Sequence, residues 1–326
     1  MSLNTLIRKR KRRTLKETYM STKASYLDDN LLFGKAFLDN DYSKINEYID
    51  TQVSFTFRKE DNGSVCGYVL TVNKPLSDLY GFPCYVVRFA FKDYLTEHCD
   101  RQEGLMWQIC QDLHRRINER RGYYTLRVPT HVVDLLRAFN RVFSDYMVCG
   151  CTVEEATARE TSFNMNEDVK LFYADREYRE RNREVLRKLA EESFRNFVGQ
   201  YHISNVTASK APLIYGNWID GLLSGDDRIL VAELNGEIAG FFGLRDGETG
   251  VEGVLTCVSE KFRGRGIYKS ILATVINDSI KEGKIFVSAT QLENNHVLRA
   301  WASLGMAPYY SFYNIHINHL EKENFL

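Results

Sequence analysis

The sequence of 326 residues lacks several features that mark particular protein classes. Its 43 basic and 43 acidic side chains cancel, so it has no net charge with which to attract nucleic acid or an anionic membrane. It contains no run of about 18 apolar residues, and its first residues lead straight into a basic cluster. We therefore expect no membrane-spanning helix, no secretory signal peptide and a cytoplasmic protein.

The cysteines and histidines lack the spacing of metal ligands. Seven cysteines, an odd number, favour reduced thiols over a disulfide framework. Cys149 and Cys151 share one face of an expected strand, where two packed thiols are favoured over a functional pair. His316 and His319 do not have the i, i+4 spacing of a helical zinc site. We expect no bound metal.

A basic run, Arg8 to Arg13, stands near the N-terminus. Nucleic-acid binding would be favoured by further basic clusters and interleaved aromatic residues, and the sequence has neither around this run. A solvated basic leader over residues 1–22 is the favoured interpretation.

The most informative segment is an apolar stretch, Val254 to Val258, followed by a glycine-rich basic turn and an expected helix over residues 267–282. The turn reads Arg263-Gly264-Arg265-Gly266. It brings accessible backbone N–H groups, two guanidinium groups and a helix N-terminus together, which favours a phosphate ligand. A plain solvated turn is the alternative. A dinucleotide fingerprint would need three spaced glycines, and a Walker loop would end in Gly-Lys-Ser/Thr.

The elements around this turn resemble those of the GNAT acetyltransferase superfamily. A hairpin with an Asn235-Gly236 turn precedes the apolar strand, and a strand over 284–289 and a helix led by Asn294 follow the turn. Arg263 and Gly266 occupy the first and fourth positions of the superfamily's acyl-CoA motif, Arg/Gln-x-x-Gly-x-Gly/Ala. The resemblance covers about residues 165 to 318.

The resemblance implies that acetyl-CoA is the cosubstrate. Its pantetheine arm is expected to pair with edge groups of two splayed strands, and a backbone N–H near residues 257–259 is expected to stabilise the oxyanion. Asn294 matches the position that bonds the pantetheine, with a helix N-cap as its alternative role. The residues expected to bind the cosubstrate are Cys257, Val258, Arg263, Gly264, Arg265, Gly266, Ile267, Tyr268 and Asn294.

The sequence departs from the family pattern at two positions. Trp301 stands where the family usually has the tyrosine that protonates the leaving thiolate, and an indole N–H is too weak an acid to replace a phenol. Tyr268 stands at the sixth motif position, where glycine or alanine is usual. Tyr310 and Tyr313 are the candidate acids, with a plain core role as the alternative. Glu252 is the candidate base, with a water chain as the alternative.

The first half of the chain repeats the same order of elements without the turn. A hairpin around Asn62-Gly63 is followed by strand, helix, strand, helix and strand up to residue 152, while residues 92–104 are acidic and lack paired glycines. We therefore expect an α/β (α+β) fold of two tandem GNAT-like domains, each with a mixed, mostly antiparallel twisted sheet flanked by helices. The expected boundaries are 1–22 leader, 23–155 domain without a CoA site, 156–183 charged linker or helix, 184–318 catalytic domain and 319–326 tail.

A finer resemblance points to the amino-sugar nucleotide acetyltransferases, typified by dTDP-fucosamine acetyltransferase. It rests on Ser193-Phe194, Gln200 to Ser204, Tyr215 to Ile219, and an N-terminal element at Asp29 to Gly34. The implied function is acetyl transfer to a small primary amine, preferably on an amino-sugar nucleotide. The alternative is a CoA-binding scaffold protein that has lost its acid. A homodimer is compatible with the sequence.

Overall fold

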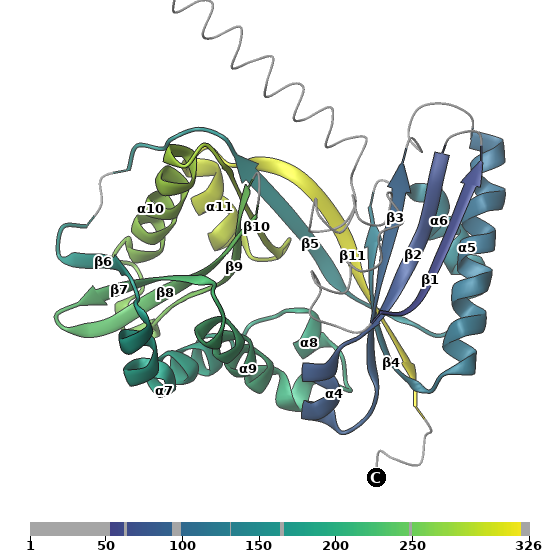
Figure 1. The fold of residues 1–326 in the computed structure, drawn as a ribbon, viewed down its shortest axis with the longest axis horizontal. Coiled ribbons are helices and arrows are strands. Elements are labelled where there is room, and N and C mark those ends of the chain that lie inside the picture. The colour runs from purple at the N-terminus through teal and green to yellow at the C-terminus, as the bar shows by residue number, and fades with distance from the viewer. Residues whose placement is uncertain are drawn as a thin grey trace, which may run out of the picture. The chain divides into compact units, whose positions relative to one another are not determined.

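The computed structural model describes residues 53–61, 64–92, 99–130, 132–163, 166–247 and 250–320 (Figure 1). The expected leader, the element at residues 29–34 and most of the tail lie outside these ranges. The chain forms two compact units, residues 1–148 with 313–326, and residues 149–312. Within the described ranges, none of the helices combines the length and hydropathy needed to span a bilayer.

The first unit is a sheet covered by two long helices. Its strand order is β1-β2-β3-β4-β11, with antiparallel pairing from β1 to β3 and a parallel β3–β4 pair. Its elements are β1 (Val53–Asp61), β2 (Ser64–Val72), α4 (Lys74–Tyr80), β3 (Cys84–Lys92), α5 (Cys99–Glu119), β4 (Gly122–Pro129), α6 (Val133–Val142) and, from Tyr313 onward, β11 (Ala307–His319).

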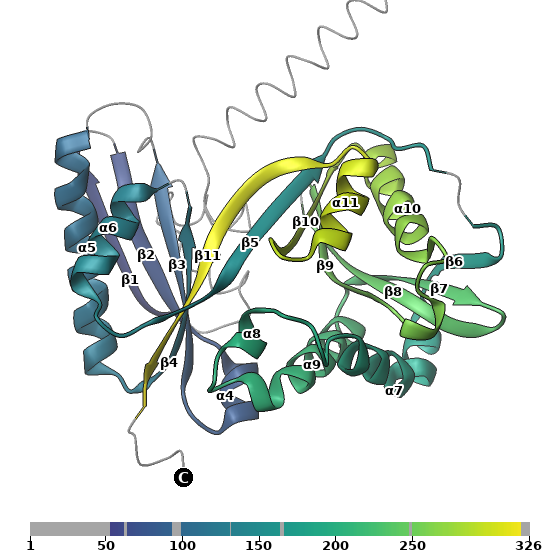
Figure 2. The same ribbon diagram turned by 180° about the vertical axis from the view of Figure 1, so that it is seen from behind.

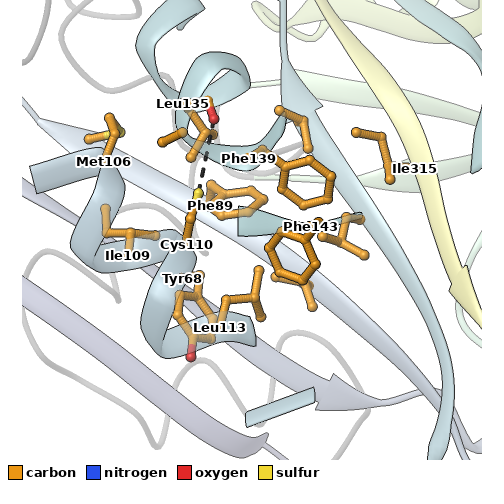
Figure 3. Packing of buried hydrophobic residues seen from close by; sticks show 14 of the residues in the cluster. Tyr68, Phe89, Met106, Ile109, Cys110, Leu113, Leu135, Phe139, Phe143 and Ile315 are labelled. Carbon is orange, nitrogen blue, oxygen red and sulfur yellow. Dashed lines mark hydrogen bonds between the residues drawn. The ribbon is translucent and has the colours of Figure 1, made fainter. Parts of the chain in front are cut away.

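The core of the first unit lies between its sheet and the helices α5 and α6. Figure 3 shows the Cys110 thiol of α5 donating to the carbonyl oxygen of Leu135 in α6, with sulfur and oxygen 4.0 Å apart. Phe89 of β3 and Ile315 of β11 belong to the same buried cluster. The last strand of the chain therefore completes the core of the first unit.

The second unit is a sheet with helices on both faces (Figures 1 and 2). Its strand order is β11-β5-β10-β9-β8-β7-β6, with parallel pairing between β9 and β10 and antiparallel pairing of β5 with β10 and from β6 to β9. Helices α10 and α11 pack on one face, and α7 and α9 on the other. The elements are β5 (Met147–Thr157, in this unit from Cys149), β6 (Val169–Tyr173), α7 (Arg176–Ser193), α8 (Gln200–Ile203), α9 (Ala211–Ser224), β7 (Arg228–Leu234), β8 (Glu237–Asp246), β9 (Gly250–Val258), α10 (Ile267–Lys281), β10 (Ile285–Gln291) and α11 (Asn295–Ser303).

The predicted hairpin at Asn235-Gly236 forms as a two-residue turn between β7 and β8. Both residues have positive φ, 55° and 78°, which is what a tight turn between twisted antiparallel strands requires. The mixed, mostly antiparallel sheets flanked by helices agree with the predicted fold class.

Residues 156–183, expected as a charged linker or helix, contain a strand as well as the start of a helix. Val169–Tyr173 is strand β6, paired with β7, and α7 begins at Arg176. Asp175 caps this helix by accepting a hydrogen bond from the N–H of Tyr178 at 2.8 Å. Leu186 and Leu189 are buried and belong to the narrow apolar stripe of the helix. The other faces of α7 carry charged side chains, so the amino-acid composition of this helix resembles that of a linker.

The unit boundaries also differ from the expected domains. Each half was expected to keep its own last strand, but Cys149–Thr157 belongs to the second unit and Tyr313–His319 to the first. A strand's alternation of buried and exposed residues fits any sheet edge of matching length. Local sequence therefore reveals these strands but not their partners.

The first unit contains a buried polar pair that should make its stability depend on pH. His316 is 2% exposed, and the Tyr123 hydroxyl lies 2.6 Å from its Nδ1. Burial lowers the pKa of His316 to about 3, below the value of about 6.5 in an unfolded chain. Protonation thus favours the unfolded state, and the stability present above pH 6.5 is lost as the pH falls toward 3.

Between pH 7.5 and pH 5, protonation of His316 should lower the free energy of unfolding of the wild type by about 2 kcal/mol. We predict that this part of the loss is absent in His316→Gln. Urea unfolding of wild type and variant at both pH values measures this difference. His319→Gln, on the same strand, is the matched control and should keep the wild-type pH dependence. An equal loss in wild type and His316→Gln would show that His316 does not carry the effect.

Candidate active site

The site begins where the two parallel strands of the second unit part. Paired residues run from Ile285–Gly250 to Ser288–Gly253, while β9 continues to Val258 and β10 to Gln291. The Ser288 hydroxyl donates to the carbonyl oxygen of Gly253 at 3.1 Å, at the last pair of the ladder. A side chain on Gly253 would meet this hydroxyl and the ring of Phe242 at under 3 Å. The packing therefore requires glycine where the strands separate.

A β-bulge in β9 lies at the same point. Gly243 of β8 pairs with Leu255, but the next residue, Leu244, pairs with Gly253, so Val254 is the extra residue. A bulge bends its strand and increases the local twist, which turns β9 away from β10. In the first unit, the β2–β3 register runs from Val65–Lys92 to Val72–Tyr85 without such a shift.

The ladder with β8 determines which backbone groups of β9 face the opening. The N–H of Ser259 donates to the carbonyl oxygen of Ala239 at 2.8 Å. Because hydrogen-bonded pairs alternate along an antiparallel ladder, Cys257 directs its N–H toward β8, and Val258 directs its N–H away. Val258 therefore presents the edge group that was expected near residues 257–259.

The Cys257 side chain lies on the face of the sheet that α7 and α9 cover, in the core of that face. It is 7% exposed, and burial raises the pKa of its thiol to about 12, although Ser193 and Arg263 partly offset the shift. The thiol is therefore neutral at physiological pH and packs as a small apolar group.

The glycine-rich turn follows β9 and ends at the first turn of α10. Gly264 and Gly266 have φ of 78° and 77°, and the turn from Arg263 to Gly266 is exposed. Ser270 is the first residue whose N–H bonds within the helix, to the carbonyl oxygen of Gly266 at 3.0 Å. The preceding first-turn N–H groups and the positive helix end thus face an exposed turn with two guanidinium groups. These residues fit a pyrophosphate group.

The segment between β5 and β6 packs beside this turn. The Asn166 side chain donates to the carbonyl oxygen of Arg265 at 3.1 Å, and its backbone N–H lies 3.4 Å from the Ser270 hydroxyl. The ring of Phe163 lies 5.8 Å from the ammonium group of Lys269. Sequence reasoning missed these contacts, because nothing in residues 158–168 marks them as neighbours of α10.

The two residues that depart from the family pattern contact each other. The indole Nε1–H of Trp301 donates to the Tyr268 hydroxyl at 2.9 Å. Trp301 is 1% exposed in the core beneath α10, and Tyr268 is half-buried against that core. Burial raises the pKa of Tyr268, and the bond from Trp301 partly offsets this. The Tyr268 phenol is therefore protonated at neutral pH and held beside the position that usually carries the acid.

Asn294 is the N-cap residue of α11, but its side chain makes no capping bond. Its Nδ2 donates instead to the Thr290 hydroxyl at 3.1 Å, while its backbone carbonyl accepts from Val297 and Leu298. Thr290 thus holds the amide group at the end of β10 with the amide oxygen available to accept a bond, which fits the expected pantetheine contact.

The structure places the predicted catalytic residues in different surroundings. Tyr310 is half-buried on the part of β11 that belongs to the second unit, 5.8 Å from the ring of Phe312. Tyr313 packs against the core of the first unit. Glu252 lies 3.8 Å from the guanidinium group of Arg245 and pairs with Val287 on β10, before the strands part.

Among the described residues, no group of three or more histidine, cysteine or acidic side chains is placed to hold a metal ion. Residues 93–98 of the acidic segment that distinguishes the first half lie outside the described ranges.

Comparison with known proteins agrees with this geometry. Residues 172–306 match the model of the acetyltransferase (GNAT) family. The matched region includes the parting strands, the glycine-rich turn and α11. Residues 172–306 thus match a GNAT acetyltransferase domain, and the predicted class, an acyl-CoA N-acyltransferase, is confirmed. The chain matches none of the curated proteins.

Solved structures share the fold over most of the chain. A GCN5-related N-acetyltransferase from Sphaerobacter thermophilus is 13% identical with a TM-score of 0.52, covering 88% of this chain and 90% of its own. A GNAT-family acetyltransferase from Colwellia psychrerythraea is also 13% identical with a TM-score of 0.52, covering 96% and 97%. A tandem GNAT protein of the clavulanic acid biosynthesis pathway is 11% identical with a TM-score of 0.50, covering 84% and 86%. At these identities the likeness concerns the fold alone.

We predict that Arg263→Glu raises the Kd for CoA at least about tenfold, because one charge-assisted phosphate contact becomes a repulsion. Isothermal titration calorimetry with CoA, which has no acyl group to transfer, measures binding alone. Lys281→Glu makes the same charge change at the other end of α10 and should leave the Kd within about twofold. Unchanged affinity in Arg263→Glu would refute the assignment of the turn as the phosphate site.

Proposed function

We propose that the protein transfers the acetyl group of acetyl-CoA to a primary amine of a small molecule, preferably on an amino-sugar nucleotide. The supporting observation is the parting of β9 and β10 at Gly253 and Ser288, followed directly by the exposed turn. An opening between two strands offers backbone groups along its length, and the turn offers phosphate-binding groups at its end. A long, thin ligand with a pyrophosphate at one end fits this arrangement.

Several residues would hold acetyl-CoA in this site. Val258 offers its edge N–H, Arg263 and the first turn of α10 offer phosphate contacts, and Asn294 offers its amide oxygen. When bound, acetyl-CoA supplies an acyl group activated as a thioester, whose leaving thiolate needs a proton. The remaining requirements are a proton donor for the sulfur and a proton acceptor for the amine.

Tyr268 is the donor best supported by its contacts. Its oxygen accepts the Trp301 N–H, so its own O–H hydrogen is directed elsewhere. Burial raises its pKa, and the bond from Trp301 partly offsets that rise, which favours transfer of the hydrogen to a thiolate. Tyr310 remains a second candidate. Tyr313 is less suited because it packs against the core of the first unit.

The preference for an amino-sugar nucleotide rests on the resemblance at residues 193–219, where the structure holds aromatic side chains together. Phe194 stacks on Tyr215 with ring centroids 4.0 Å apart, and Trp218, 6.3 Å from Tyr215, is 40% exposed. An exposed indole on a rigid aromatic base is a surface on which a nucleotide base can stack.

The proposed activity predicts CoA release that depends on the acceptor. We expect amino-sugar nucleotides to release CoA with kcat/KM at least about tenfold above that of the free amino sugars, because the nucleotide adds binding energy. A thiol-release assay over an amine panel, with mass spectrometry of the acetylated product, measures this. Arg263→Glu is the low-activity control. CoA binding without turnover on any amine would instead support a scaffold protein.

The proposed acid predicts an ordered effect among three tyrosine variants. We expect Tyr268→Phe to lower kcat about 100-fold with acetyl-CoA, since general acid catalysis contributes on the order of 10²–10⁴. Tyr310→Phe and Tyr313→Phe should lose less than about fivefold. An aryl thioester, whose thiolate leaves without protonation, should recover most of the Tyr268→Phe loss. Loss of kcat in Tyr310→Phe alone would transfer the role to Tyr310.

A further inference from the structure

Glu155 lies one strand away from the point where β9 and β10 part. In the antiparallel β5–β10 ladder it is directly opposite Ser288. Ser288 is also the last residue of β10 that pairs with β9. Ser288 therefore lies between the two: the β9–β10 ladder ends on one side of it, and Glu155 stands on the other.

The side chain of Glu155 projects to the face that carries α10 and α11. Phe286, two residues before Ser288, belongs to the core with Trp301, so Ser288 lies on that face as well. Directly opposed residues of an antiparallel ladder share a face, which places Glu155 there too. Glu155 thus shares this face with the Tyr268–Trp301 pair.

The contacts of the described residues do not explain why Glu155 is buried. The residue is 7% exposed, and none of the described residues gives its buried Oε2 a hydrogen bond. A buried carboxylate is ordinarily paired or hydrogen-bonded, because removing it from water costs several kcal/mol. Burial also raises its pKa, and no neighbouring charge contributes to that shift. A carboxylate that is shielded from water beside a reaction site is suited to accept a proton from a ligand.

The neighbouring acidic residues lack this combination. Glu154, the next residue, projects to the opposite face by the alternation of the strand, opposite Ala289. Glu252, the base expected from the sequence, is ion-paired with Arg245 and lies opposite Val287, on the face away from Phe286.

We propose that Glu155, on the strand that the first half of the sequence supplies to the second unit, is the general base that takes a proton from the attacking amine. The proposal rests on the proposed acetyl transfer. As the new C–N bond forms and the C–S bond breaks, one amine proton passes to the Glu155 carboxylate, directly or through a water. Tyr268 gives its proton to the departing thiolate, and the proton on Glu155 returns through solvent to the tyrosinate. The products are an amide and a thiol.

The test compares Glu155→Gln, which keeps the shape of the side chain but cannot take up a proton, with Glu154→Gln on the same strand. We expect Glu155→Gln to lower kcat about 100-fold or more while the Kd for CoA measured by calorimetry stays within about twofold. Glu154→Gln should keep kcat within about fivefold. Glu155→Asp, with a displaced carboxylate, should recover part of the loss.

The pH profile supplies a readout that a structural role would not change. Wild-type kcat should fall on the acidic side as Glu155 is protonated, and this limb should disappear in Glu155→Gln. On β10, the face shared with Glu155 carries Phe286, Ser288 and Thr290, none of which titrates near neutral pH. The titratable or charged groups on the other neighbouring elements include Tyr268 and Lys269 at the start of α10, His296 and Arg299 on α11, and Tyr310 on β11.

Each outcome has one meaning. Active wild type together with a Glu155→Gln variant that keeps more than half of kcat and the same acidic limb overturns the role of Glu155 but leaves the acetyltransferase activity standing. A Glu155→Gln variant that loses CoA affinity as well overturns the role of a base, because the residue then supports the site. Wild type without transfer to any amine overturns both proposals.

Discussion

The end of the β9–β10 ladder is the constraint on which the rest of the site depends. Two parallel strands that stayed paired would satisfy each other's backbone groups and leave none for a ligand. Here Gly253, the bulge at Val254 and the Ser288 hydroxyl end the pairing within one residue step. The turn at residues 263–266 follows the freed strand directly, so the opening and the phosphate-binding groups are joined by continuous backbone.

The same opening needs support on its other side, and β5 supplies it. β10 has lost its partner beyond Ser288 on the β9 side, and the β5 ladder covers the opposite edge from Phe286 to Gln291. Gln291 adds a side-chain bond to the Thr152 hydroxyl at 2.9 Å. Because β5 comes from the first half of the sequence, the second unit is not complete without that half. The first half of the sequence therefore has a structural role in the second unit.

The elements with local signals could be predicted from the sequence. The Asn235-Gly236 hairpin, the strand before Arg263 and the helix after Gly266 depend on neighbouring residues, and the described ranges contain them close to the expected positions. The exchanged strands, the contact of Tyr268 with Trp301 and the burial of Glu155 depend on residues about 30 to 130 positions apart. The spacing of residues does not reveal such contacts. The alternation of side chains along a strand shows which residues share a face, but not which other element that face contacts.

Tyr268 and Trp301, the two residues that depart from the family pattern, act on each other and have to be considered as a pair. Taken singly, Trp301 removes the expected phenol and Tyr268 adds bulk to a motif that usually stays small. Taken together, a phenol on α10 lies beside the α11 position where the family usually has one, and the indole at that position donates a hydrogen bond to the phenolic oxygen at 2.9 Å. A hydrogen bond from a buried indole fixes the orientation of the hydroxyl at little entropic cost, because both rings are held by the core. The pair can therefore keep an acid in the site although neither residue matches the family at its own position.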